Sequence, residues 1–66
     1  MSILEILEKR ADDGATELHV SREEAAAIVD NFYSMNRFHK HSRRDIQRML
    51  REGQLMAFGK PLRVNG

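Results

Sequence analysis

Apolar residues recur at helical spacing in three segments of the chain, and a serine precedes each segment. Ser2, Ser21 and Ser42 each stand three residues before an acid, which is the spacing of a helix amino-terminal cap. Gly14 and Gly53 follow the first and third segments, and glycine commonly ends a helix at this position. The pattern therefore predicts three helices, the second of them over residues 22–33.

Two further stretches have the pattern of strands. Apolar and polar residues alternate over residues 16–20, which is typical of a short strand with one buried face. Near the carboxyl end, two apolar runs flank Gly59 and Lys60, and this arrangement predicts a β-hairpin with its turn at those two residues. Pro61 suits the start of an edge strand because it has no N–H group to donate.

The order of these elements predicts the fold class. Residues 34–41 have no clear period and are expected to form a loop between the second and third helices. Sixty-six residues are enough for one small core. We therefore expect a single α+β domain over residues 1–66 in the order α-β-α-α-β-β. This is the order of a small winged helix-turn-helix, in which the lone strand joins the terminal hairpin in one sheet.

The charges are divided unevenly along the chain. Residues 1–36 hold three cations and eight acids, a net charge of −5, whereas residues 37–66 hold eight cations and two acids, a net charge of +6. The overall charge of +1 conceals this division. A strongly basic half predicts a polyanionic partner.

Within the basic half, one arc of the predicted third helix is polar and cationic. At about 100° per residue, the far side of the helix carries Ile46, Met49 and Leu50, and the arc carries Arg43, Arg44, Gln47, Arg48 and Arg51. Arginine can fork onto guanine and glutamine onto adenine, and a helix fits the major groove of DNA. We expect the first four residues of the arc to read bases and Arg51 to contact phosphate. Further cations extend the predicted patch: Arg37, Lys40, Lys60 and Arg63. The alternative is that the arc is simply the solvated face of an amphipathic helix.

The segments SREEAAAIV and SRRDIQRMLREGQLMAFGKPLRV resemble the winged-helix pattern of excisionases and MerR-type regulators. In that pattern a Ser/Thr-capped "EEAA" helix precedes an arginine-rich helix that ends in "REG" and an apolar residue, followed by a short wing and a closing strand. The resemblance covers about Val20 to Val64. It implies that the arginine-rich helix faces DNA and that Gly59 and Lys60 form the tip of the wing. It also implies a small phage or mobile-element protein that binds double-stranded DNA in transcription regulation or recombination.

A second hypothesis comes from a different class of function. The chain is then a small phage-encoded interaction protein that inhibits a host protein without binding DNA, through either the basic face or residues 33–38. Tyr33, Met35 and Phe38 are candidates for exposed contact with a host protein or with a second copy in a homodimer.

The remaining expectations are absences. The sequence offers no nucleophile–base pair, phosphate-binding glycine loop or carboxylate dyad, so we expect neither an enzyme nor a cofactor. His39 and His41 flank Lys40 without a third ligand nearby, which argues against a metal site. The chain contains no cysteine, no apolar run that would span a bilayer and no signal-peptide core, so we expect a cytoplasmic protein without membrane contact.

Overall fold

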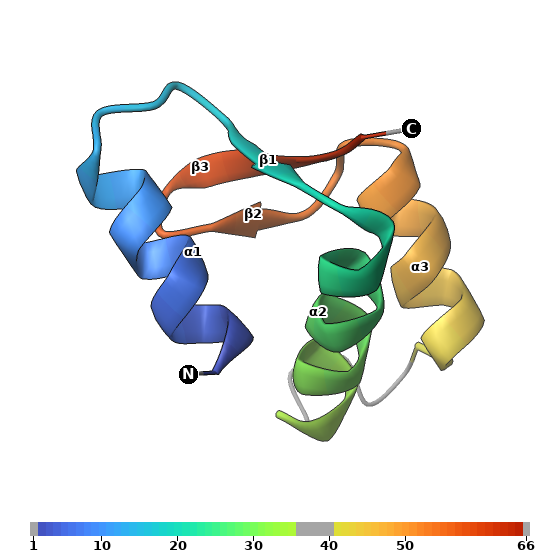
Figure 1. The fold of residues 1–66 in the computed structure, drawn as a ribbon. Helices are drawn as coiled ribbons and strands as arrows, with labels where there is room; N and C mark the ends of the chain where they lie inside the picture. The colour runs from blue at the N-terminus through green and yellow to red at the C-terminus, as the bar shows by residue number, and fades with distance from the viewer. Residues whose placement is uncertain (1, 36–40, 66) are drawn as a thin grey trace.

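A computed structural model describes residues 2–35 and 41–65 and contains, within them, three helices and a three-stranded sheet (Figure 1). The order confirms the predicted α-β-α-α-β-β arrangement. Its elements are α1 (Ile3–Asp12), β1 (Leu18–Val20), α2 (Arg22–Ser34), α3 (Arg43–Arg51), β2 (Met56–Ala57) and β3 (Lys60–Val64).

The predicted serines begin all three helices. In α2 the Glu24 N–H donates to Ser21 Oγ (3.1 Å) and the Ser21 N–H donates to Glu24 Oε1 (2.8 Å), a complete capping box. Ser42 and Asp45 make the same reciprocal pair at the start of α3. In α1 the Glu5 N–H donates to Ser2 Oγ. These bonds satisfy backbone donors that the first turn of a helix leaves without partners.

Gly53 ends α3 as predicted, with a φ of +74° that a side chain would strain. The Gln54 N–H donates to the Met49 carbonyl and the Gly53 N–H to the Leu50 carbonyl. This pair of bonds is the Schellman motif, which turns the chain sharply away from the helix axis. The chain then enters the sheet within a few residues of the end of α3.

The sheet has the strand order β1-β3-β2. The strand β1 runs parallel to β3, with Leu18 opposite Leu62 and Val20 opposite Val64. The strand β2 runs antiparallel to β3. Parallel neighbours need a long crossover connection, which α2 and α3 provide between β1 and the hairpin.

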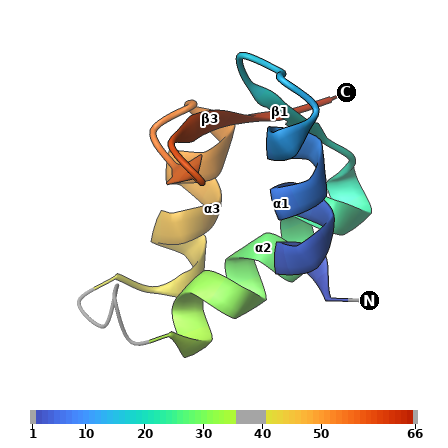
Figure 2. The same ribbon diagram turned by 90° about the vertical axis from the view of Figure 1, so that its left-hand side faces the viewer.

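The three helices lie on one side of this sheet, with α2 between α1 and α3 (Figures 1 and 2). The core fills the space between the helices and the inner face of the sheet. Its fully buried side chains are Leu7, Leu18, Val20, Ile28, Ile46, Leu50 and Leu62. Because Ile46 and Leu50 are in this core, the opposite side of α3 must face outward.

The hairpin turn differs from the prediction by one residue. Phe58 (φ +53°) and Gly59 (φ +76°) form the turn, and Lys60 is the first residue of β3, opposite Ala57. A two-residue turn with two positive φ angles matches the twist of a hairpin, but phenylalanine rarely adopts this conformation. Lys60 is therefore not at the tip of the hairpin.

Candidate nucleic-acid interface

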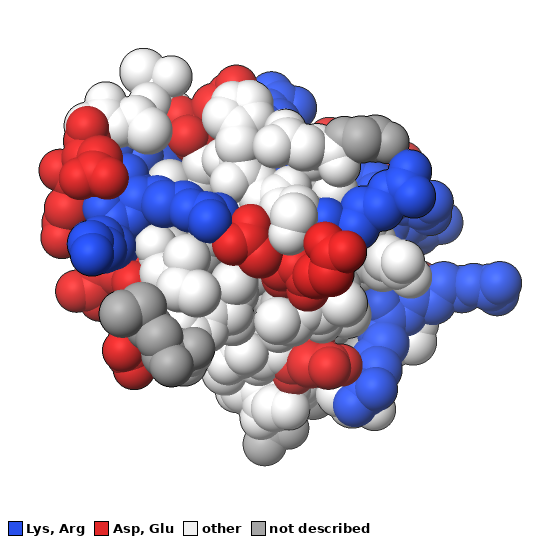
Figure 3. All heavy atoms as spheres, viewed as in Figure 1, with Lys and Arg blue, Asp and Glu red and all other residues white. Residues whose placement is uncertain are grey.

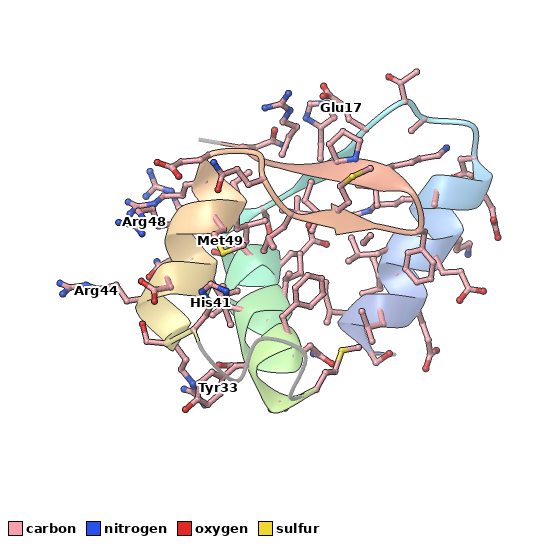
Figure 4. All side chains as sticks on the ribbon, turned by 180° about the vertical axis from the view of Figure 1, so that it is seen from behind. Glu17, Tyr33, His41, Arg44, Arg48 and Met49 are labelled. Atoms are coloured by element: carbon pink, nitrogen blue, oxygen red, sulfur yellow. The ribbon has the colours of Figure 1, made fainter. Side chains whose placement is uncertain are left out.

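The outward face of α3 carries the predicted polar arc. Arg44, Gln47, Arg48 and Arg51 are all exposed, whereas Ile46 and Leu50 are buried and Met49 is half-buried. Figure 4 shows Arg44 and Arg48 extending from α3 away from the rest of the protein. The outward orientation of these side chains agrees with the face assignment made from the sequence.

The charged side chains at the two ends of α3 interact favourably with the helix dipole. Asp45 lies in the first turn, near the positive end of the helix dipole, and Arg48 and Arg51 lie in the last turn, near the negative end. The acid in the first turn also completes the capping box. A short helix of nine residues is thereby stabilised while its outer face stays basic.

Arg43 differs from the other arginines because it is engaged with α2. Its guanidinium lies 5.1 Å from the centre of the Tyr33 ring, and its Nη1 lies 3.4 Å from Asp30 Oδ1. These contacts connect the start of α3 to the last turns of α2. Within the predicted arc, Arg43 is thus the arginine whose guanidinium has a carboxylate and an aromatic ring of α2 as neighbours.

The other three arginines of α3 are less constrained. Arg48 Nη2 lies 3.9 Å from Asp45 Oδ1, and an exposed pair at this distance contributes little to stability. Arg44 and Arg51 make no hydrogen bond or ion pair with any residue in the described ranges 2–35 and 41–65. Their charges are accessible to a ligand.

The structure places Lys60 away from this face, contrary to its predicted place in the patch. Its Nζ donates to the carbonyl of Ala11, in the last turn of α1, and to that of Ala15, in the segment between α1 and β1. The helix α1 lies on the other side of α2 from α3 (Figure 1). Residue separations of 49 and 45 explain why local sequence patterns did not reveal these bonds.

Arg63 lies near the carboxyl end of α3 but is also paired. A Cβ atom at Gly53 would lie 2.6 Å from Arg63 Nη1, so the guanidinium passes close to this glycine. Arg63 Nε donates to Glu17 Oε2 at 3.0 Å. The neighbouring carboxylate reduces the positive charge that Arg63 offers to a polyanion. The other predicted residues of the patch, Arg37 and Lys40, lie outside the described residues.

Figure 3 shows lysine and arginine side chains over α3, on the right of the view, and a second group over α1, on the left, with carboxylates around it. Within the acidic part, Arg10 is paired with Glu24. The uneven charge along the sequence is thus an uneven charge in space.

A groove between α2 and α3 was not predicted from the sequence. Its volume is about 480 Å³, and its lining comes from α2 (Arg22, Ala25, Ala26, Val29), α3 (Gln47, Arg51) and the end of the chain (Val64, Asn65). The α2 residues have the spacing i, i+3, i+4 and i+7, which places them on one helix face. The run of three alanines at 25–27 was the available signal, because small side chains leave space between two helices.

A second hollow is apolar and lies on another part of the surface. It has a volume of about 290 Å³ and is lined by Leu4, Phe32, Met35, Met56, Ala57 and Phe58. Met35 is 43% exposed and Tyr33 is 44% exposed, as expected of contact residues. Phe38, the third predicted contact residue, lies outside the described residues.

The described part of the chain lacks both a metal-binding cluster and a membrane-spanning helix. It contains no group of three or more potential metal ligands, although His39 lies outside this part. None of its helices combines the length and apolar content needed to cross a lipid bilayer. No protein-family model, curated protein or solved structure matches the sequence or the fold.

Proposed function

We propose that the chain is a small DNA-binding protein that inserts α3 into the major groove of double-stranded DNA. The observation that carries this proposal is the exposed row of Arg44, Gln47, Arg48 and Arg51 on a helix whose opposite face is in the core. A helix of this kind presents forked donors to base edges and phosphates without exposing apolar residues.

The distribution of charge supports one orientation on DNA. Arg44 and Arg51 have no carboxylate partner in residues 2–35 and 41–65, so binding to phosphate does not first require an ion pair to break. One carboxylate of α2, that of Asp30, lies beside Arg43 of α3 and leaves Arg44 and Arg51 without a carboxylate neighbour in the described ranges. Phosphates are therefore attracted to these two arginines of α3.

The resemblance of residues 20–64 to excisionases and MerR-type regulators narrows the proposed role to transcription regulation or recombination. Both roles place the protein with DNA, in the cytoplasm of a bacterial cell. The long connection between α2 and α3 departs from the tight turn of that family.

The direct test is binding of a labelled duplex, measured by fluorescence anisotropy between ~50 and ~200 mM salt. Affinity should fall steeply with salt, with a log–log slope of about −0.9 for each phosphate neutralised. Arg51→Ala should weaken binding severalfold, because Arg51 is expected to contact phosphate. Lys9→Ala removes one equally exposed cation from α1 and is the matched control, for which we expect no change. Absence of binding at ~50 mM salt contradicts the proposal.

A protein-binding function is the second candidate, and the apolar hollow beside Phe58 favours it. Met56 and Phe58 are 58% and 48% exposed, which is unusual for large apolar side chains in so small a domain. In that case a host protein binds at the hollow and DNA does not bind at α3. Phe58→Asp should then abolish capture of the host protein while Arg44→Ala leaves it intact.

A further inference from the structure

The groove between α2 and α3 has two kinds of surface. Ala25, Ala26, Val29 and Val64 give it apolar walls, and Arg22, Arg51, Gln47 and Asn65 supply charged and amide groups. The two arginines come from different helices, and both are exposed. A ligand that fits needs an apolar part and an anionic group that accepts several hydrogen bonds.

A deoxyribose phosphate has this composition. Its sugar carbons can rest on alanine and valine methyl groups, and its phosphate oxygens accept forked bonds from guanidinium groups. The volume of about 480 Å³ lies in the range of small-ligand sites. The groove is therefore large enough for a sugar and its phosphate.

We propose that this groove seats one sugar–phosphate unit of the DNA backbone, with the phosphate between Arg22 and Arg51. The inference rests on the proposed function and adds a specific anchoring site to it. Arg22 belongs to the acidic half of the sequence and was not among the residues expected to contact DNA. The groove gives it a role in the same interface as α3.

Continuity with α3 favours a DNA backbone over an acidic peptide. Gln47 and Arg51 line the groove and also belong to the exposed arc of α3. Arg44 and Arg51 are separated by seven residues, which is about 10 Å along the helix axis. A nucleic-acid strand that follows α3 from Arg44 therefore arrives at the groove near Arg51.

Filling the groove without changing its charge is the sharpest test. Ala26 is exposed on α2, so Ala26→Leu places a larger side chain in the groove while keeping a residue that favours helix. We expect duplex affinity to fall about tenfold, which corresponds to about 1.4 kcal/mol. Ala26→Ser adds a single oxygen atom, so it fills much less of the groove and should weaken binding less than Ala26→Leu. Thermal melting of both variants checks that they are folded.

A second test removes the positive charge of Arg22 from the groove. Arg22→Ala should weaken binding and reduce the magnitude of the salt slope by about one, because one phosphate contact is lost. Equal affinities of the Ala26→Leu and Ala26→Ser variants, together with an unchanged slope for Arg22→Ala, overturn the groove site. If α3 substitutions still weaken DNA binding in that case, the proposed function stands without it.

A third test asks whether the groove binds duplex DNA, a free nucleotide or an acidic protein. The probes are duplex DNA, deoxyadenosine monophosphate, inorganic phosphate and a polyglutamate peptide. Methyl signals of Ala25, Ala26 and Val29 in an NMR spectrum report directly on the groove. We expect duplex DNA to shift them at micromolar concentration and the mononucleotide only at millimolar concentration. Shifts by mononucleotide at micromolar concentration, or by polyglutamate but not duplex, assign the groove to a free nucleotide or an acidic protein and overturn the proposal.

Discussion

The guanidinium of Arg10 and the carboxylate of Glu24 form a bidentate ion pair between α1 and the first turn of α2. Arg10 Nη1 donates to Glu24 Oε1 at 2.9 Å and Nη2 donates to Oε2 at 2.6 Å. The same carboxylate accepts the Ser21 N–H. The bonds from Arg10, followed by the bond from Ser21, lower the pKa of Glu24 to about 2.

The pair makes stability depend on pH in acid. Since the pKa of Glu24 is lower in the folded state than its ordinary value of 4.5, its contribution is complete above that value and is lost as pH falls towards 2. Glu24→Gln should reduce the free energy of unfolding by about 1 to 2 kcal/mol at pH 7, a value discounted because Arg10 is partly exposed. Urea unfolding at several pH values should show this difference shrinking below pH 4.

Glu23→Gln is the matched control for this measurement, because Glu23 is an exposed neighbour in the same turn. It removes the same charge and should show little difference at any pH. A Glu24→Gln effect that stays constant down to pH 2 would exclude the ion pair as its origin.

Lys60 should contribute to folding more than to DNA binding. Its ammonium donates to the carbonyls of Ala11 and Ala15, in and just after α1, and Lys60→Met removes both bonds while keeping an apolar stem. We expect a loss of about 1 to 2 kcal/mol in the free energy of unfolding, measured with urea. Duplex affinity should change less than in Arg51→Ala. A folded, fully stable Lys60→Met variant with tenfold weaker DNA binding would show that Lys60 contacts DNA directly.

Replacing Phe58 by a residue that tolerates a left-handed backbone should raise the free energy of unfolding. A left-handed backbone costs about 1 to 2 kcal/mol for most residues, and Asn-Gly is the preferred pair for this type of hairpin turn. Phe58→Asn should raise the free energy of unfolding by about 1 kcal/mol, measured by thermal or urea denaturation. Phe58→Leu keeps the strain and should give no gain. If Phe58→Asn is destabilising instead, packing of the Phe58 ring against the apolar hollow outweighs the backbone strain.

Local signals in the sequence were sufficient for the elements and the buried face of each helix. A cap such as Ser21 with Glu24 depends only on residues within one turn, so the start of the helix can be predicted. The spacing of Ile46 and Leu50 likewise predicts which face of α3 is buried. The direction of β1 could not be predicted from the sequence. Whether β1 runs parallel to β3 depends on the path of the chain through α2 and α3. The turn was misplaced because phenylalanine disfavours the conformation that Phe58 adopts.

The candidate site was predictable to the same extent. The arginine arc follows from helical periodicity alone, and the structure places it outward. The contacts of Arg43 with Tyr33 and Asp30 depend on how α2 and α3 cross, which no local pattern determines. The groove around Ala26 depends on the same crossing.

The last prediction separates sequence reading from general attraction to DNA. Phosphate contacts weaken binding to all sequences alike, whereas base contacts matter only at the cognate site. Arg44 and Gln47 lie in the first two turns of α3, the part of a recognition helix that reaches base edges, and Arg51 lies in the last turn. At a selected target, Arg44→Ala or Gln47→Ala should cost about 1 to 3 kcal/mol and have little effect on random DNA. Arg51→Ala should weaken both and reduce the magnitude of the salt slope by about one. Anisotropy titrations with both duplexes measure these differences. If all three substitutions weaken target and random DNA equally, α3 binds the backbone without reading bases, and the protein coats DNA rather than recognising a site.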